Sequence, residues 1–279
     1  MLVRGGVIQA MQPFRFGGFL CGVFLFTLLS GTVTAALLPR SWEVEGVTRE
    51  ALVVTPTASA DPHGSPKPLV FIFHGHGGTS RHAARSFSLH TAWPEAVCVY
   101  PQGLPTAGRL TDPEGRKAGW QARAGDYLDR DLKFFDIMLA SLQREQAIDP
   151  RRIYVSGHSN GGAFTYLLAA KRWDVLAAIA PSAAIMTPSP DGIKPIPVLH
   201  IAGQSDALVR FAWQKRTIDA LCRINKCEIL QPLRLGLNQF LSKEGGHVFV
   251  FLHPGGHEFP KEAPAEIAAF FKKLQKKGF

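Results

Sequence analysis

Residues 152–164 read RIYVSGHSNGGAF, and this stretch decides the fold. Its first half is an apolar run that predicts a buried strand, and its second half favours a helix. Between the two, Ser159 stands among Gly157, Gly161 and Gly162. A strand that turns tightly into a helix is typical of α/β proteins. The turn itself has three interpretations: an ordinary connection, a phosphate-binding loop, or the seat of a nucleophile.

The rest of the chain repeats this alternation of strands and helices. Apolar runs predict strands at 41–47, 50–56, 68–73, 96–101, 152–157, 176–184, 196–203 and 247–252, and helical patterns lie at 128–148, 161–173, 211–224 and 263–277. The Gly- and Pro-rich stretch 103–120 is expected to form a long surface loop. Continuous apolar runs are typical of strands covered on both faces. We therefore expect one α/β domain over 36–279, with a mostly parallel sheet and helices on both faces.

The first 35 residues have the pattern of a signal peptide. Arg4 and Arg15 precede an uncharged run, 17–36, and the small residues Val33 and Ala35 suit cleavage after Ala35. An uncleaved anchor is the alternative, because the run is long enough to span a bilayer. We predict a signal peptide over 1–35 and a secreted, periplasmic or extracellular protein, with membrane contact only through an uncleaved segment.

The composition argues against two classes of protein. With 46% hydrophobic and 19% charged residues in 279, the chain is expected to bury a core rather than stay disordered. The net charge of +9 invites a nucleic-acid interpretation. However, the basic residues are spread out, and their one dense cluster, 272–277, ends a helical pattern where cations are expected. We predict no nucleic-acid partner, and the oligomeric state stays open.

The residues around the turn favour a nucleophile. A phosphate-binding loop needs a lysine after its glycines, whereas Ala163 and Phe164 follow here. Residues 157–161 instead match G-x-S-x-G between a strand and a helix. In that context the turn lifts the Ser159 hydroxyl above the edge of a sheet.

A nucleophilic serine needs a base and a group that orients the base. In this architecture an acid and then a histidine follow the serine along the chain. Asp206 comes after the strand at 196–203, and His257 comes after the strand at 247–252. Ser159, Asp206 and His257 are therefore the predicted catalytic triad, with Asp191 and Glu228 as alternative acids.

An oxyanion hole needs two backbone donors. The N–H of Asn160, directly after the serine, is one candidate. The other should come from the glycine-rich loop after the strand at 68–73, and we predict the N–H of His76. The side chains of His74 and His76 are expected to be structural, and His200 is expected to be a core histidine. Asp129 and Asp131 are expected to serve the start of a helix.

Six motifs carry a family resemblance. They are FHGHGGT (73–79), GWQARAG (119–125), IDPRRIYVSGHSNGG (148–162), AAIAPSAA (177–184), HIAGQSDALVRF (200–211) and GGHEFP (255–260). Their order resembles that of secreted esterases of the poly(3-hydroxybutyrate) depolymerase and feruloyl esterase group, over about residues 45–275. The resemblance implies the α/β-hydrolase fold, serine esterase activity without metal or organic cofactor, and the triad and oxyanion donors given above.

The chain departs from that group at three places. His76 stands where some depolymerase relatives have a cysteine, Phe259 stands where a tryptophan is common, and GWQARAG lacks cysteines found in many relatives. These changes bear on which acyl group is accepted. Trp120, His158 and Phe259 are candidate substrate-binding residues, with packing as the alternative for each.

The expected chemistry is hydrolysis of a carboxylic ester through an acyl-enzyme. Only eleven residues separate the strands around 177–184 and 196–203, which leaves no room for a large cap domain. An open site suits a polyester of the 3-hydroxybutyrate type or short acyl esters, and feruloyl or acetyl-xylan esters are the alternative. A serine peptidase and a non-catalytic surface-binding protein are weaker hypotheses. Cys222 and Cys227 are close enough in sequence for a disulfide, and their pairing stays open.

Overall fold

The computed structural model describes residues 1–2, 36–57, 64–108, 110–186, 192–228 and 233–276. The predicted signal peptide over 1–35 lies outside these residues, apart from its first two. Within the described part of the chain, no helix is long and apolar enough to cross a membrane.

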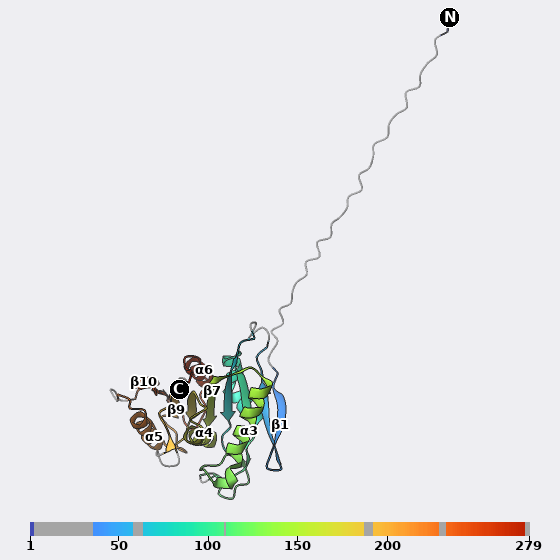
Figure 1. Cartoon of the computed structure of the whole chain (residues 1–279). Coiled ribbons are helices and arrows are strands. Elements are labelled where there is room, and N and C mark those ends of the chain that lie inside the picture. The colour runs from blue at the N-terminus through green and yellow to red at the C-terminus, as the bar shows by residue number, and fades with distance from the viewer. Residues whose placement is uncertain (3–35, 58–63, 109, 187–191, 229–232, 277–279) are drawn as a thin grey trace. The chain divides into compact units, whose positions relative to one another are not determined.

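A nine-stranded sheet is the centre of the described residues from 36 onward, in the order β1-β2-β4-β3-β7-β8-β9-β11-β10 (Figure 1). Its strands are β1 (Leu38–Val44), β2 (Val47–Val54), β3 (Lys67–Phe73), β4 (Val97–Pro101), β7 (Ile148–His158), β8 (Ala178–Ser182), β9 (Val198–Gly203), β10 (Gly236–Phe240) and β11 (Val248–His253). The six strands from β4 to β11 in this order pair in parallel, and antiparallel strands flank them at both edges. The expected mostly parallel sheet is confirmed.

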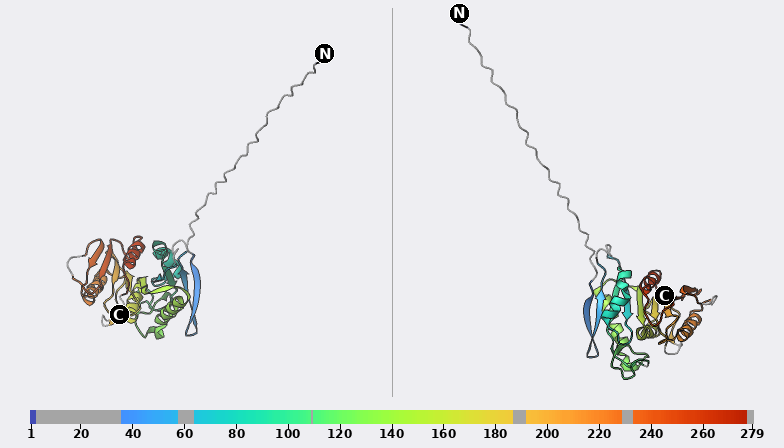
Figure 2. Two further views of the ribbon diagram at one scale, coloured as in Figure 1. Left: turned by 45° about the horizontal axis from the view of Figure 1, so that its top comes forward. Right: turned by 180° about the vertical axis from the view of Figure 1, so that it is seen from behind.

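Helices cover both faces of the sheet, as the apolar runs predicted (Figure 2). One face is packed against α3 (Arg130–Glu145), α4 (Asn160–Lys171) and α5 (Phe211–Ile224). The other is packed against α1 (Ser80–Phe87), α2 (Leu89–Ala92) and α6 (Ala263–Lys272). The middle strands read as continuous apolar runs because both of their faces are buried.

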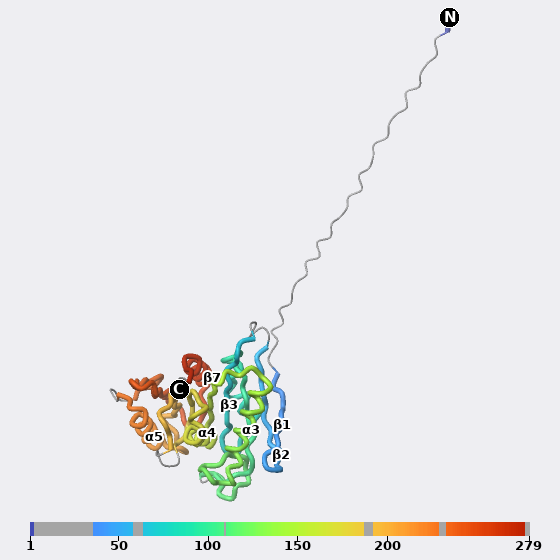
Figure 3. The backbone as a smooth tube through the Cα atoms, viewed as in Figure 1, coloured from blue at the N-terminus to red at the C-terminus, as the bar shows by residue number. Residues whose placement is uncertain are grey.

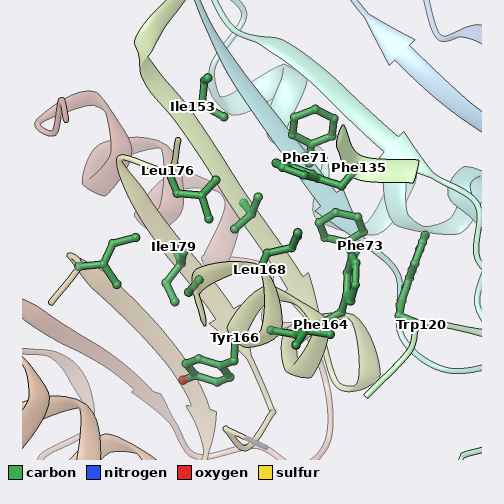
Figure 4. Close-up of a cluster of buried hydrophobic side chains, with 14 of the residues drawn as sticks. Phe71, Phe73, Trp120, Phe135, Ile153, Phe164, Tyr166, Leu168, Leu176 and Ile179 are labelled. Carbon is green, nitrogen blue, oxygen red and sulfur yellow. The ribbon is translucent and has the colours of Figure 1, made fainter. Parts of the chain in front are cut away.

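Aromatic rings fill the core between the sheet and α3 and α4 (Figure 4). Phe73 packs edge-on against Trp120 and Phe164, with ring centroids 5.0 and 4.9 Å apart. Trp120 and Phe164 are stacked at 5.5 Å. These rings lie just below the carboxyl end of β3 and the start of α4, so they support the backbone that follows both elements.

The structure contains elements that the sequence patterns did not predict. Helices α1 and α2 fill the stretch after β3, and β10 forms the last edge of the sheet. The predicted loop 103–120 holds two short paired strands, β5 (Leu104–Pro105) and β6 (Ala118–Gly119). The 3-10 turn η1 (Asp126–Asp129) then leads into α3. Such short or edge elements have too few apolar positions for a periodic pattern.

A buried ion pair joins α3 to the edge of the sheet, where the helix runs beside β1 (Figure 3). The guanidinium of Arg49 on β2 lies 2.8 Å from the Asp131 carboxylate, and both side chains are almost completely buried. The same carboxylate accepts a hydrogen bond from the N–H of Gln121. Asp131 was expected to act only at the helix start; it also neutralises a buried cation. Asp129 accepts from the Gly125 N–H in the preceding turn, not from a helix N–H.

Replacing Asp131 with alanine should lower the free energy of unfolding by about 3–5 kcal/mol, because it leaves Arg49 buried and unpaired. Asp136→Ala is the matched control: it also lies on α3 and pairs with an arginine, but both side chains of that pair are partly exposed. Its loss should cost less than about 1 kcal/mol. Equal losses for the two variants in urea unfolding would contradict a special role for the buried pair.

Candidate active site

Ser159 lies in the sharp turn between β7 and α4, with φ 55° and ψ −118°. This is a sparsely populated region for a residue with a side chain, so the surrounding structure must hold it. The flanking glycines allow the close approach that does so. A Cβ on Gly157 would lie 2.4 Å from the Gly161 carbonyl oxygen, and one on Gly161 would lie 2.3 Å from the Phe73 oxygen. Gly157 and Gly161 therefore lie in close contact with each other, and Gly161 also lies against the end of β3.

The predicted triad residues meet at the carboxyl edge of the sheet. The Ser159 Oγ lies 2.8 Å from the His257 Nε2, and the His257 Nδ1 lies 2.9 Å from the Asp206 Oδ2. They come from the loops after β7, β9 and β11, whose carboxyl ends share one edge because these strands are parallel. The His257 side chain is 20% exposed and the Asp206 side chain is fully buried.

The buried Asp206 carboxylate is fully hydrogen-bonded. Its Oδ1 accepts from the N–H groups of Leu208 and Val209, at 2.9 and 2.8 Å. Its Oδ2 accepts from His257 and from the Gln214 side-chain amide, 3.0 Å away. Four donors suit an ionised carboxylate, which can then orient the imidazole so that Nε2 faces the serine.

The two segments that carry the predicted oxyanion donors lie next to the nucleophile. Asn160 begins α4, and the first N–H groups of a helix lack partners within the helix. A Cβ on Gly75 would lie 3.5 Å from the Ser159 Cβ, so the loop that carries His76 comes directly against the turn. In the described part of the chain, neither the His76 N–H nor the Asn160 N–H donates a hydrogen bond to another residue. Their role as oxyanion donors stays a prediction that this placement supports.

Trp120 does not line the substrate pocket, so its prediction as a substrate-binding residue was wrong. Its indole is 1% exposed, and the Nε1–H donates to the His74 carbonyl at 2.9 Å. Its N–H donates to the Asn160 Oδ1 at 2.7 Å, and the Asn160 amide donates back to the Trp120 carbonyl at 3.0 Å. Trp120 therefore ties together the two segments that carry the predicted oxyanion donors. The indole can pack in the core because its one polar group, the Nε1–H, has a backbone carbonyl as partner.

A pocket of about 670 Å³ opens beside Ser159. Among its lining residues are the other two candidate substrate-binding residues, His158 and Phe259. Phe259 packs on Phe87 with ring centroids 4.2 Å apart, and the His158 ring lies 6.1 Å from Phe259. The rest of the lining is Gly75, His76, Gly77, Gly78, Thr79, His82, Ser86, Thr111, Leu208, His257 and Glu258. An aromatic wall thus stands on one side of the nucleophile.

The residue His76 lines the pocket, and its side chain makes a contact that the sequence did not predict. Its Nε2 lies 3.3 Å from the Asp112 carboxylate. That carboxylate also accepts a hydrogen bond from the Lys117 N–H, which together with His76 holds the pKa of Asp112 below its usual value. The loop 103–120 thereby packs against the pocket through His76, and Thr111 of the same loop lines it.

The other residues considered in the sequence analysis lie away from the triad or make structural contacts. The His74 imidazole accepts from the Gly103 N–H at 2.9 Å, as expected for a structural side chain. Glu228 lies beside Lys243 on the surface, and Asp191 lies outside the described residues. Cys222 and Cys227 are both free thiols, and burial raises the pKa of Cys222 to about 12.

Sequence reasoning did not find the residues behind and beside the triad. Gln214 on α5 contacts Asp206, and Phe87 and Ser86 on α1 line the pocket. Gln214 lies beyond the end of the motif at 200–211, and α1 was not predicted at all. Only the three-dimensional arrangement brings these side chains to the site.

Proteins of similar sequence are esterases. A putative esterase, NocK, of Nocardia uniformis subsp. tsuyamanensis is 31% identical over 186 residues, which cover 63% of this chain and 51% of that protein. Feruloyl esterase D of Neurospora crassa is 26% identical, over 74% of this chain and 73% of that protein. The chain thus spans only about half the length of the Nocardia relative. No protein-family model matches it.

Solved structures of similar fold include esterases and a serine hydrolase. A ferulic acid esterase aligns with a TM-score of 0.63 and 13% identity, over 86% of this chain and 98% of that chain. An acetyl xylan esterase from Aspergillus awamori aligns with a TM-score of 0.62 and 11% identity, over 84% and 99%. The chain has the α/β-hydrolase fold, and the resemblance to the feruloyl esterase group that its motifs indicate is confirmed.

Three buried histidines in and around the site predict how the stability of the fold depends on pH. Burial lowers the pKa of His74 to about 4, that of His200 to about 4 and that of His158, which also lies near His257, to about 3. The unfolded chain takes up these protons below about pH 6.5, whereas the folded chain does not. Stability should therefore be full above pH 6.5 and fall as the pH approaches 4.

We expect the melting temperature to fall by roughly 5–10 °C between pH 7.5 and pH 5.0. Most carboxylates titrate below this window, so the histidines dominate the change. Differential scanning calorimetry in buffers of matched ionic strength measures it. A constant melting temperature across this window would show that these histidines are not buried as neutral groups.

Proposed function

We propose that this chain is a serine carboxylic-ester hydrolase with Ser159 as nucleophile, His257 as base and Asp206 as the orienting acid. The observation that carries the proposal is the continuous pair of hydrogen bonds, 2.8 and 2.9 Å, from Ser159 through His257 to Asp206. An ordinary strand–helix connection does not require this arrangement. The similarity to esterases in sequence and fold supports the same conclusion.

The proposed reaction has two halves. The Ser159 Oγ attacks the ester carbonyl while its proton passes to the His257 Nε2, and the tetrahedral oxyanion is stabilised by the N–H groups of His76 and Asn160. The intermediate collapses, the alcohol leaves with the proton from His257, and an acyl-enzyme remains. Water then gives a proton to His257 and attacks the acyl carbon; the second tetrahedral intermediate collapses, the proton passes from His257 to the Ser159 Oγ, and the acid is released. Asp206 stays ionised throughout and stabilises the imidazolium.

The pocket supports an aromatic acyl group as substrate. The rings of Phe87, Phe259 and His158 form one wall beside the nucleophile, and such rings favour stacked or edge-on contact with another ring. On α1 the Ser86 hydroxyl and the His82 Nε2 lie 3.2 Å apart and also line the pocket. They could hydrogen-bond a phenolic hydroxyl. We therefore favour hydroxycinnamoyl esters such as those of ferulic acid, in line with the feruloyl esterase relatives.

The polyester hypothesis, which the sequence motifs placed first, shares the same chemistry and remains the second candidate. The motifs shared with depolymerases support it. No cap domain covers the triad in the described part of the chain, and an open site also suits the end or side groups of a polymer. Secretion remains a prediction from residues 1–35.

The nucleophile is tested by comparing the wild type with Ser159→Ala on methyl ferulate, 3-hydroxybutyrate oligomers and 4-nitrophenyl acetate. We expect the wild type to release ferulate and the variant to lose a factor of about 10⁴ or more in kcat. Release of hydroxybutyrate without ferulate would move the proposal to polyesters. If wild type and variant were equally inert on all three esters, the esterase proposal would fail.

The aromatic wall is tested by Phe259→Ala. Loss of one ring contact should raise KM for methyl ferulate by about three- to tenfold and leave KM for 4-nitrophenyl acetate, which has a small acyl group, nearly unchanged. Phe249→Ala is the control, because Phe249 packs on Phe270 away from the pocket. Equal changes for both esters would mean that Phe259 does not contact the acyl group.

A further inference from the structure

We propose that Gln214 is a positioning residue that holds the Asp206 carboxylate in place for His257, and that His200 and Tyr166 fix the orientation of the Gln214 amide. This inference rests on the proposed function, because it concerns how the same site is kept in its active geometry. It adds three buried side chains to the machinery, none of which touches the substrate pocket.

Gln214 is fully buried and makes three hydrogen bonds. Its Nε2 donates to the Asp206 Oδ2 at 3.0 Å and to the Val209 carbonyl at 2.7 Å. Its Oε1 faces the His200 Nε2, 3.1 Å away. Because Oδ2 is also the atom that accepts from His257, Gln214 sets the position of the oxygen on which the imidazole depends.

The orientation of the Gln214 amide is decisive. Only its nitrogen can donate to the carboxylate; a flipped amide would place its oxygen against an anion. In the productive orientation the amide oxygen faces His200, so the His200 Nε2 must carry a proton and donate it. A histidine with the proton on Nδ1 instead would favour the flipped amide and leave Asp206 without this donor.

Tyr166 selects the required tautomer of His200. Its hydroxyl lies 2.6 Å from the His200 Nδ1, which is its one hydrogen-bond partner among the described residues. A fully buried hydroxyl that accepted a proton there would leave its own proton unpaired, so it donates, and Nδ1 accepts. Burial lowers the pKa of His200 to about 4, which keeps the imidazole neutral at working pH. All three hydrogen bonds are therefore donated in the same direction: Tyr166 donates to His200, His200 donates to Gln214, and Gln214 donates to Asp206.

This chain of hydrogen bonds connects the acid to the helix of the nucleophile. Tyr166 lies on α4, the helix that begins directly after Ser159, while His200 lies on β9 and Gln214 on α5. In Figure 4 the Tyr166 hydroxyl points away from the aromatic core that packs around Phe164. Ser159 is also linked to Asp206 through His257. The hydrogen-bonded residues and the first two turns or so of α4, from Ser159 to Tyr166, therefore form a closed ring. A shift of the acid loop relative to the nucleophile would break at least one of these buried bonds.

The test is a double-mutant cycle on the whole chain with Gln214→Met, Tyr166→Phe and their combination, assayed with 4-nitrophenyl acetate. Tyr100→Phe is the matched control: it is a fully buried tyrosine whose hydroxyl lies 2.8 Å from the His90 Nδ1, in the core on the other face of the sheet. Titration of active sites with a fluorophosphonate gives kcat per folded site, and melting temperatures report stability separately.

Gln214→Met should lower kcat about tenfold or more with KM within about twofold, and Tyr166→Phe should lower kcat about threefold or more. In the Gln214→Met background, Tyr166→Phe should have no further effect on kcat, because its effect passes through the amide. Tyr100→Phe should lower the melting temperature but leave kcat per active site unchanged. If Gln214→Met did not fold, the contrast between the two Tyr→Phe variants would still decide.

Two results would overturn the inference. In the first, the wild type is active and kcat per active site is unchanged in Gln214→Met or in Tyr166→Phe. In the second, the two losses multiply in the double variant, as they would for independent structural effects. An inert wild type would instead overturn the proposed function, and this inference with it.

Discussion

The site depends on one backbone constraint, the turn that holds Ser159 at φ 55° and ψ −118°. The conformation persists because the start of α4 lies so close to the ends of β3 and β7 that neither Gly161 nor Gly157 has room for a Cβ. The aromatic core below the turn supports this contact. With the turn in place, the serine side chain rises above the sheet and the first N–H groups of α4 lie beside it.

The parallel sheet does the rest of the assembly. Loops after β3, β7, β9 and β11 leave the same edge, so residues about 180 positions apart, such as His76 and His257, line one pocket. Hydrogen bonds then fix the orientation of the segments and side chains that the sheet brings together. Trp120 holds the segments of His74 and Asn160 together, and Gln214 holds the buried carboxylate. Rigid elements carry the site, and buried polar side chains orient it.

How much the sequence predicts differs between parts of the molecule. The fold and the triad follow from local patterns, because G-x-S-x-G between a strand and a helix, and an acid and a histidine after later strands, are readable one segment at a time. Trp120 was misassigned, since an aromatic residue in a glycine-rich loop has no pattern that distinguishes the core from a pocket wall. Gln214 and Tyr166 were not noticed, because their partners lie 8 and 34 positions away on other elements.

The central claim is that Ser159 is a nucleophile activated by His257 and Asp206. Reaction with a fluorophosphonate, followed by digestion and mass spectrometry, tests it without any assumption about the ester. The account predicts one adduct, on the peptide that contains Ser159, and much slower labelling of His257→Ala. Labelling of another residue, or labelling at the wild-type rate when His257 is absent, would contradict it.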